Sequence, residues 1–250
     1  MAALRVREVV VVERLRTKLR VSIVIPVFNE SKGLKSLFLS LEPFLSDVHE
    51  LIFVDGGSVD NTRELITAFL LTQQKVQLLC SEKGRAKQMN AGGFEAEGDV
   101  LVFLHADTFL PPSALNHLNE FSNSESKWGR FNVSLDNNAW PFRIISWFIN
   151  HRSRLSGIST GDQAIFVSKK VFDEISGYTG QPLMEDVELS KRLKRLSAPF
   201  CIADPVITSA RKWEQGGILK TIFLMWRLRI AYALGARPED LVDQYYMKNK

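Results

Sequence analysis

The stretch VSIVIPVFNE, residues 21–30, decides the fold, because a short, β-branched apolar run stops abruptly at Asn29 and Glu30. Such a run is typical of a strand that is covered on both faces of a sheet. Beyond it, apolar residues recur at the spacing of a helix that buries one face, namely Leu34, Leu37, Phe38 and Leu41. The sequence therefore predicts a strand over residues 21–28 and a helix directly after it.

The alternation of strand and helix continues through the first half of the chain. ELIFVDGGS (50–58), VQLLCSE (76–82) and DVLVFLHAD (99–107) predict three further strands. Helical patterns over residues 65–70 and 83–98 lie between them, and the second of these is rich in small residues. Strands that alternate with helices in this way form a mostly parallel sheet. We therefore predict an α/β, Rossmann-like fold with helices on both faces of a central sheet.

The second half of the chain has a less regular pattern. The elements predicted there are helices over 111–121, 141–155 and 184–196, a half-exposed strand over 131–135, a strand over 162–168 and an extended segment over 200–210. No internal repeat and no Gly/Ser-rich linker separates the halves. We therefore predict one domain over residues 21–213, with halves 21–110 and 111–213, followed by a helical segment over 214–250.

The composition is that of an ordinary globular protein, with 250 residues of which 45% are hydrophobic and 24% charged. The net charge of +4 is small for a nucleic-acid-binding protein, and it suits an anionic small molecule or a membrane surface about equally well. Cys80 and Cys201 have no metal or redox spacing. We interpret them as buried thiols in a reducing compartment, the cytoplasm.

The first twenty residues form a basic extension, residues 1–20, ahead of the predicted domain. They lack the long apolar run and the small-residue cleavage site of a signal peptide. No stretch of about 18 uncharged apolar residues occurs anywhere in the chain. We therefore expect no transmembrane helix.

A helix predicted over residues 218–234 is apolar but interrupted by three basic residues, Lys220, Arg227 and Arg229. Such a helix can lie in a membrane interface, with Trp226 and Tyr232 at the depth of the lipid headgroups. Alternatively, it packs on the domain's own core with Arg229 buried against an acid. The pattern leaves both interpretations open, so peripheral membrane contact through residues 214–250 is one of two expectations.

Polar side chains gather where the predicted strands end. Asn29 and Glu30 follow the first strand, Asp55 ends the second, and His105 and Asp107 end the fourth. The loops after parallel strands share one edge of the sheet, where ligands bind, so these residues predict a ligand site. The alternative is that such residues mark turns and helix caps. In the DGGS sequence that begins at Asp55, the glycines permit close approach to a ligand, and the carboxylate suits a ribose hydroxyl or a base.

His105 and Asp107 are two residues apart, which would place both side chains on one face of a strand. A carboxylate at a strand end is a suitable ligand for Mg²⁺ or Mn²⁺ that holds a diphosphate. Lys83, Arg85 and Lys87 supply positive charge in the preceding segment, although both lysines equally suit a solvated surface. These residues together predict the phosphate end of the site.

Glu185 and Asp186 open the helix predicted over residues 184–196. Acids are favoured at a helix start, so capping is a real alternative to function. The functional interpretation is a general base that removes a proton from an acceptor hydroxyl. Adjacent helical residues diverge by about 100°, so only one acid faces the site directly. We assign Asp186 as the base, with Glu185 as the second candidate.

Six segments of the chain occur in the order of one family: SIVIPVFNE (22–30), FVDGGSVDNT (53–62), KGRAKQMNAG (83–92), DVLVFLHADT (99–108), GDQAIFV (161–167) and LMEDVELSKRL (183–193). Together they resemble a family 2 glycosyltransferase of the GT-A fold. The HADT, TGDQAIF and PLMEDVELS sequences resemble a compact, mostly bacterial subgroup of that family. The resemblance implies a mostly parallel sheet followed by a helical tail.

The resemblance also implies a role for each matching residue. The implied roles are nucleoside binding for Pro26, Asn29, Glu30 and Asp55, contact with the diphosphate or base for Arg85 and Gln88, metal binding for Asp107, base catalysis for Asp186, and the acceptor side for Gly161, Asp162 and Gln163. His105 replaces the first aspartate of the family's DxD motif, yet it can still bind Mn²⁺ or a ribose. Trp213 remains from the QxxRW motif of processive members, and we place it on the acceptor side.

From the resemblance we expect an inverting transferase that moves a sugar from a nucleotide sugar, with uridine as the family's default, to an acceptor hydroxyl. We expect a divalent metal, Mn²⁺ or Mg²⁺, and an acceptor of open identity that includes the lipid-linked class. The expected location is the cytoplasm, including the inner face of its membrane. A nicotinamide dehydrogenase or a nucleotidyltransferase would need a glycine-rich loop where this chain has PVFNE. The alternative from another class is a non-catalytic protein, descended from such an enzyme, that binds a nucleotide sugar or a partner.

Overall fold

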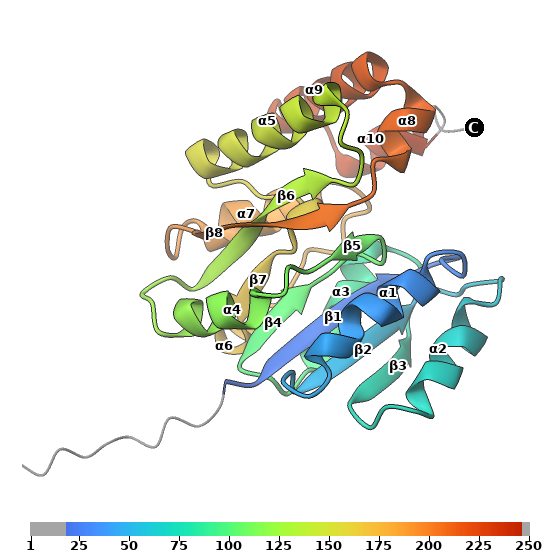
Figure 1. Ribbon diagram of the computed structural model, residues 1–250. Coiled ribbons are helices and arrows are strands. Elements are labelled where there is room, and N and C mark those ends of the chain that lie inside the picture. Colours follow the sequence, from blue (N-terminus) through green and yellow to red (C-terminus); the bar gives the residue numbers. More distant parts are fainter. Residues whose placement is uncertain (1–18, 247–250) are drawn as a thin grey trace, which may run out of the picture.

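The computed structural model describes residues 19–246, with only the backbone of Tyr246, so nearly all of the predicted extension 1–20 lies outside the described residues. Its centre is an eight-stranded sheet in the order β3-β2-β1-β4-β7-β6-β8-β5 (Figure 1). The strands are β1 (Val21–Val27), β2 (Glu50–Asp55), β3 (Val76–Cys80), β4 (Val100–Phe103), β5 (Thr108–Phe109), β6 (Trp128–Leu135), β7 (Phe166–Ser168) and β8 (Phe200–Thr208). The predicted mixed, mostly parallel α/β architecture is confirmed.

The first half forms the parallel part of this sheet, because β1 pairs in parallel with both β2 and β4, and β2 with β3. Helices α1 (Leu34–Leu41) and α2 (Thr62–Leu70) cover one face, and α3 (Arg85–Glu95) covers the other. Alternate residues of β1 enter the two cores, as strand geometry requires. Ile23 and Ile25 pack with α1, whereas Val24 packs with α3. The small residues of α3 allow this contact, since a Cβ on Gly92 would lie 2.5 Å from the Val24 side chain.

The second half adds strands of both directions to the β4 edge. Strand β7 pairs antiparallel with β4 and with β6, while β6 pairs in parallel with β8. Over residues 131–135 the predicted half-exposed strand is confirmed, because Phe131, Val133 and Leu135 are buried while Asn132 and Ser134 between them are partly exposed. The helices of this half are α4 (Ala114–Ser122), α5 (Trp140–Ser156), α6 (Lys169–Glu174) and α7 (Glu185–Leu193).

Two predicted strands are shorter than expected, and in both cases the polar end forms a turn. The fourth strand ends at Phe103, and the amide of Thr108 bonds to the carbonyl of His105 as the chain reverses into β5. His105 and Asp107 therefore lie in a turn and not on one face of a strand. The segment predicted as a strand from residue 162 begins with a one-turn 3₁₀ helix, η2 (Gly161–Gln163).

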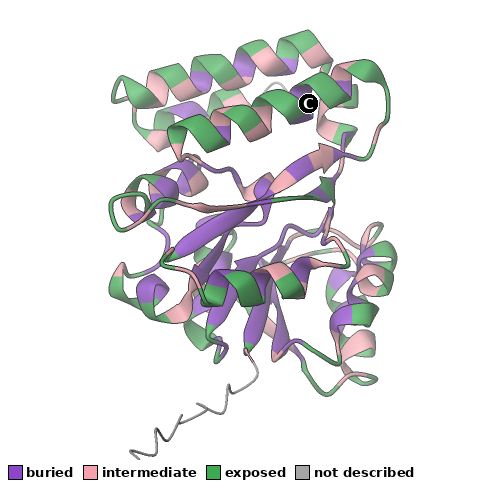
Figure 2. Cartoon of the chain, turned by 60° about the vertical axis from the view of Figure 1, so that its left-hand side comes forward, coloured by how far each residue is buried: buried purple, intermediate pink, exposed green. Residues whose placement is uncertain are grey.

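Three helices form the carboxyl-terminal part: α8 (Arg211–Gly216), α9 (Ile218–Ala233) and α10 (Pro238–Tyr246). Apolar residues of α9 join Phe142 and Ile145 of α5 in one cluster, so the two long helices lie side by side over the sheet (Figures 1 and 2). Leu224 and Leu228 of α9 pack with the start of α7. The predicted helical tail is confirmed. Within residues 19–246, no helix combines the length and the apolar character that a membrane span requires.

The two cysteines are less buried than expected. Cys80 is exposed and Cys201 is half-buried, so the interpretation of both as buried thiols is wrong. Cys80 ends β3, which is an edge strand and has a neighbour on one side only. A thiol at the end of an edge strand lies beyond the helices that cover the sheet.

Candidate active site

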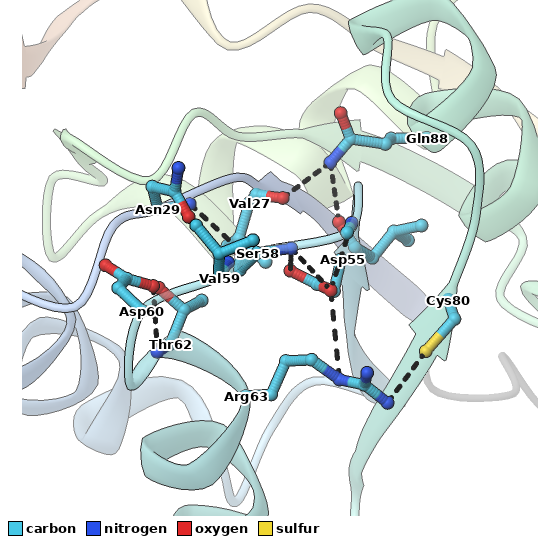
Figure 3. A network of polar contacts seen from close by, with 12 residues as sticks. Val27, Asn29, Asp55, Ser58, Val59, Asp60, Thr62, Arg63, Cys80 and Gln88 are labelled. Carbon is cyan, nitrogen blue, oxygen red and sulfur yellow. Dashed lines mark hydrogen bonds and ion pairs between the residues drawn. The ribbon is translucent and has the colours of Figure 1, made fainter.

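The loops that follow β1 and β2 hold each other in place at the carboxyl edge of the sheet (Figure 3). The amide of Asn29 donates to Oγ of Ser58 at 2.9 Å, and its Oδ1 accepts from the amide of Val59 at 2.9 Å. The amide of Glu30 donates to Oγ1 of Thr62 at 2.9 Å. Asn29 and Glu30 are thus fixed in the predicted place by hydrogen bonds between the two loops.

Asp55 stabilises the turn after β2 with its own carboxylate, as Figure 3 shows. Its side chain is 1% exposed, and its oxygens accept from the amides of Gly57 at 3.1 Å and Ser58 at 3.1 and 3.2 Å. Nε of Arg63 lies 3.8 Å from its Oδ2. This is the geometry of the turn-forming alternative. The contact of Asp55 with a nucleoside stays a prediction.

Gln88 joins the ends of β1 and β2 from the side of α3 (Figure 3). Its Nε2 donates to the carbonyls of Val27 at 2.7 Å and Val54 at 2.8 Å. Its amide packs against Gly56, where a Cβ would come within 3.0 Å. Pro26 lies in β1 opposite Val54 and is buried. Both residues lie at the expected edge, but Gln88 uses its amide to fix the two strands, and its contact with a nucleotide stays a prediction.

Two acids and two arginines form the charged part of this edge. Burial, followed by the charge of Asp107, raises the pKa of the Glu30 carboxyl, while Arg211 and Arg85 act against the rise. The Asp107 side chain is 39% exposed, and its Oδ2 lies 3.7 Å from a guanidinium nitrogen of Arg211. Arg85 begins α3 directly after Gly84, whose φ of 140° suits glycine. This mixture of charges suits a ligand that brings both phosphate groups and a cation.

The turn η2 brings residues of the two halves into contact. Nδ1 of His105 lies 3.5 Å from Oδ1 of Asp162. The amide of Gly161 donates to Oδ2 of Asp186 at 2.9 Å. Gly161 also lies against the imidazole, since a Cβ at this position would come within 2.4 Å of Nε2 of His105. Four of the predicted site residues, from three separate segments, therefore lie together at one turn.

Glu185 carries an acid group that remains protonated to unusually high pH. Burial, followed by the charge of Asp186, raises the pKa of Glu185 to about 7, and Arg85 and His105 act against this rise. Asp162 differs, because burial would raise its pKa but the hydrogen bond and the charge of His105 hold that pKa below its usual range. The cluster thus contains one carboxyl that exchanges a proton near neutral pH and one that stays ionised. Neighbouring acids whose pKa values are shifted in opposite directions are typical of active sites.

Backbone strain is concentrated around this cluster. Among the described residues, four non-glycine residues have positive φ, and three of them border the site: Asn29 (55°), Ala164 (44°) and Met184 (63°). An L-residue in this region costs roughly 1–2 kcal/mol, and such strain is common at functional sites. Met184 directly precedes α7, so its conformation sets the direction in which Glu185 and Asp186 enter the site.

Gln163 and Trp213 have packing roles next to the cluster. Gln163 is fully buried, its Oε1 accepts from the amide of Thr160 at 3.3 Å, and its Nε2 donates to the carbonyl of Phe131 at 3.4 Å. Trp213 in α8 packs against the apolar cluster around Phe142 of α5. Both lie in the second half, as expected, and their contact with an acceptor stays a prediction.

Arg152 on α5 is a residue of this region that the sequence pattern did not single out. Burial, followed by the charge of Arg229, lowers the pKa of Arg152 to about 10, and Asp186 acts in the opposite direction. Its spacing from Ile145 and Ile149, both on the packed side of α5, was the available signal. Arg229 of α9 has no acid within ion-pair distance among residues 19–246. The expected burial of Arg229 against an acid is therefore wrong.

The residues at the strand edge fit a divalent metal that is shared with a diphosphate. Asp107 presents an exposed carboxylate, and Mg²⁺ is commonly held by one or two carboxylates together with the phosphates of a substrate. In the described part of the chain, no three His, Cys, Asp or Glu side chains lie close enough to hold a metal by themselves. His105 directs Nδ1 to Asp162, so its role as a second metal ligand stays a prediction.

The chain is similar in sequence to known glycosyltransferases. The sequence profile of "Glycosyl transferase family 2" matches residues 22–176. An undecaprenyl-phosphate 4-deoxy-4-formamido-L-arabinose transferase of Yersinia pestis (strain Pestoides F) is 35% identical over 105 residues, which cover 40% of this chain and 32% of that protein. The chain thus spans about a third of the length of the curated relatives it matches.

Comparison with solved structures shows the same fold at low sequence identity. The S. aureus TarS in complex with UDP has a TM-score of 0.61 and 15% identity, over 76% of this chain and 60% of that one. The mannosyltransferase PcManGT from Pyrobaculum calidifontis, in complex with GDP-Man and Mn²⁺, has a TM-score of 0.61 and 17% identity, over 86% of this chain and 62% of that one. At these identities the likeness shows the fold, which is the expected GT-A fold.

Proposed function

The chain belongs to glycosyl transferase family 2, and we propose that it moves a sugar from a nucleoside-diphosphate sugar to an acceptor hydroxyl in one in-line displacement. The observation that carries this proposal is the cluster at η2. There Asp162 of the second half lies against His105 of the strand edge, and Gly161, which packs on the same imidazole, donates its amide to Asp186. A donor at the carboxyl edge of the parallel sheet would therefore lie next to acids that can act on an acceptor.

The donor would lie across the ends of β1, β2 and β4. We assign the nucleoside to Pro26, Asn29, Glu30 and Asp55, and the diphosphate to Arg85 and Asp107. The nucleotide is UDP in our proposal, in line with the TarS complex, although PcManGT holds GDP-Man. A thermal-shift panel of UDP-, GDP- and dTDP-sugars with Mn²⁺ and Mg²⁺ tests this assignment. A larger stabilisation by a GDP- or dTDP-sugar than by UDP-sugars would contradict it.

In the proposed reaction the acceptor oxygen bonds to the anomeric carbon as the bond from that carbon to the diphosphate oxygen breaks. Asp186 takes the proton of the acceptor hydroxyl. The diphosphate leaves with the bonding electrons, and the guanidinium groups of Arg85 and Arg211 stabilise its added charge. Attack opposite the leaving group inverts the anomeric configuration. A divalent metal held by Asp107, when bound, would supply further positive charge to the leaving diphosphate.

The choice of base between Asp186 and Glu185 can be tested with two variants and a control. We expect Asp186→Asn to lower kcat by about 10²–10⁴-fold, which is the usual contribution of general base catalysis, and to leave donor binding unchanged. Asp47→Asn changes an exposed acid in the loop before β2, at the opposite end of the parallel strands, and serves as the control. Unchanged turnover in Asp186→Asn, together with its loss in Glu185→Gln, would move the base to Glu185. Retained turnover in both variants would contradict the mechanism.

The acceptor in our proposal is lipid-linked, and the exposed surface of helices α5 and α9 supports contact with a membrane. The side chains of α5 and α9 that face solvent are unusually apolar: Trp140, Ile144, Trp147, Phe148 and Leu155 on the first helix, and Leu219, Phe223, Trp226 and Ile230 on the second. Neither helix contains an acidic residue, whereas Arg143, Arg154, Lys220 and Arg227 are exposed on them. Apolar residues flanked only by positive charge suit an anionic lipid surface. Tyr232 does not face outward as expected, because it packs beneath Lys191 of α7.

Vesicle co-sedimentation tests the membrane contact. We expect the full chain to bind vesicles that contain anionic phospholipid, and binding to weaken with salt. The pair Trp147→Ser and Trp226→Ser should reduce binding about tenfold, because it removes two exposed indoles. Leu71→Ser, which changes an even more exposed apolar residue after α2, is the control. Equal binding by the indole variants and the control would contradict the assignment of this surface.

A further inference from the structure

Three arginines, the buried Arg130 on β6 and the half-buried Arg152 on α5 and Arg229 on α9, each have an unsatisfied buried nitrogen. Nε of Arg130, Nη2 of Arg152 and Nε of Arg229 are buried and lack a hydrogen-bond partner. Buried polar groups in proteins are nearly always paired, and unpaired ones that carry charge are especially unfavourable. Three such atoms on three different elements therefore call for an explanation.

The three arginines differ in what else holds them. Arg130 on β6 donates to Oδ1 of Asn132 and to the carbonyl of Asn150, so the strand and α5 fix its position. Arg152 and Arg229, by contrast, make no side-chain hydrogen bond and no ion pair within the described residues. Besides burial, the charge of Arg229 lowers the pKa of Arg152, and two guanidinium groups that interact without a counterion are suited to receive an anion from outside the chain.

Neighbouring contacts place this pair beside the proposed catalytic cluster. Leu228, which precedes Arg229, packs with Met184 and Val187 on either side of Glu185 and Asp186. Ser153, which follows Arg152, lies 3.4 Å from the hydroxyl of Ser159, two residues before η2. The charges of Asp186 and Asp162 act on Arg152 as well. The pair thus lies near the acids of the second half that we assign to the acceptor.

We propose that Arg152 and Arg229 bind a phosphate group of the acceptor, and this inference rests on the proposed transferase function. A phosphate presents several oxygens to donors that approach from two helices, as these two guanidinium groups do. The group would anchor the acceptor with its hydroxyl next to Asp186. The same phosphate chemistry can belong to a lipid phosphate or to a soluble sugar phosphate, and the experiment below separates these sources.

The test measures phosphate binding by the full chain while its donor site is filled with UDP and Mg²⁺. Three probes are titrated: inorganic phosphate, glucose 1-phosphate, and a polyprenyl phosphate in detergent micelles against plain micelles. We expect Arg152→Gln and Arg229→Gln each to weaken phosphate binding tenfold or more, with Arg152→Lys intermediate. Arg195→Gln, which changes an exposed arginine after α7, should bind as the wild type does. Tighter binding of the micellar probe than of glucose 1-phosphate assigns the lipid source, and the reverse assigns the soluble one.

A second measurement needs no variant and so remains valid if the glutamine variants fail to fold. Phenylglyoxal modification of the wild-type chain, mapped by mass spectrometry, should be slowed at Arg152 and Arg229 by the probe that binds best, and unchanged at the exposed Arg195. Asp186→Asn should keep phosphate binding while it loses turnover, which separates this inference from the transferase proposal. No binding of any probe, or equal binding by the wild type and both glutamine variants, would overturn the inference.

Discussion

Replacing Glu185 with glutamine should stabilise the protein at neutral and alkaline pH. The carboxyl is buried at the start of α7 next to Asp186, and these two causes raise its pKa from 4.5 to about 7. Glutamine has nearly the same shape and stays neutral, so it removes the cost of holding a buried charge. Turnover is a separate matter, because a stabilised site is often a less active one.

The pH window follows from the two pKa values. Below pH 4.5 the carboxyl is protonated in both the folded and the unfolded chain, so the charge costs nothing. As the pH rises toward 7 the unfolded chain has lost the proton while the folded chain retains it, and folding becomes progressively less favourable. Above pH 7 both forms have lost the proton, and the full cost of the buried charge lowers the free energy of unfolding. At about 1.4 kcal/mol for each pH unit, the gap between 4.5 and about 7 corresponds to about 3 kcal/mol.

The assay is urea unfolding of the wild type and of Glu185→Gln at pH 5, 6, 7 and 8. We expect the difference in the free energy of unfolding to be small at pH 5 and to reach about 3 kcal/mol in favour of the variant at pH 8. Glu125→Gln changes an exposed glutamate in the loop before β6, and its effect should stay within about 0.5 kcal/mol. A difference that is the same at pH 5 and pH 8 would refute the reasoning, because it would show that the charge of Glu185 is not what destabilises the site.

Three further predictions concern Gly161 and Gln88 at the site and the exposed thiol of Cys80. Gly161→Ala places a Cβ 2.4 Å from Nε2 of His105, so we expect at least a tenfold loss of kcat/KM and a lower Tm, whereas Gly180→Ala, which has open space around it, should change neither. Gln88→Ala removes two buried hydrogen bonds that join β1 and β2, and calorimetry should show about 1–3 kcal/mol of destabilisation without loss of secondary structure by circular dichroism. In the native protein a thiol reagent should modify exposed Cys80 rapidly, and Cys80→Ser should abolish this fast reaction; an unchanged rate would place the reactive thiol elsewhere.

Much of the fold could be predicted because the decisive patterns are local. The apolar run from Val21 specifies a buried strand, and the helical spacing of the apolar residues after it specifies an amphipathic helix. The structure has both. The errors arose where neighbours distant in sequence set the environment. The fourth strand ends before His105 because the chain turns there into β5, which pairs with β8 much later in the chain. The exposure of Cys80 likewise depends on β3 being an edge strand.

The site was predictable in its location and less so in its details. The ends of parallel strands necessarily share an edge, so Asn29 and Asp55 could be placed from sequence. Their present hydrogen bonds to neighbouring loops could not, because these depend on how closely the loops approach. The resemblance to a family supplied the acceptor-side residues, which no local pattern identified. Arg152 and Arg229 were not assigned to the site from sequence, since basic residues in an apolar helix suit a membrane interface as well as a binding site.

The sequence by itself determined the order of strands and helices, the parallel first half and the edge of the sheet at which a ligand would bind. Hydrophobic period and turn residues are properties of neighbouring positions, so they can be recognised before the chain is folded. Only the tertiary structure decided that η2 brings His105, Asp162 and Asp186 together, and that Arg152 and Arg229 lie unpaired beside them. Those contacts join residues far apart in the chain, and they depend on the packing of α5, α7 and α9, which no local pattern records.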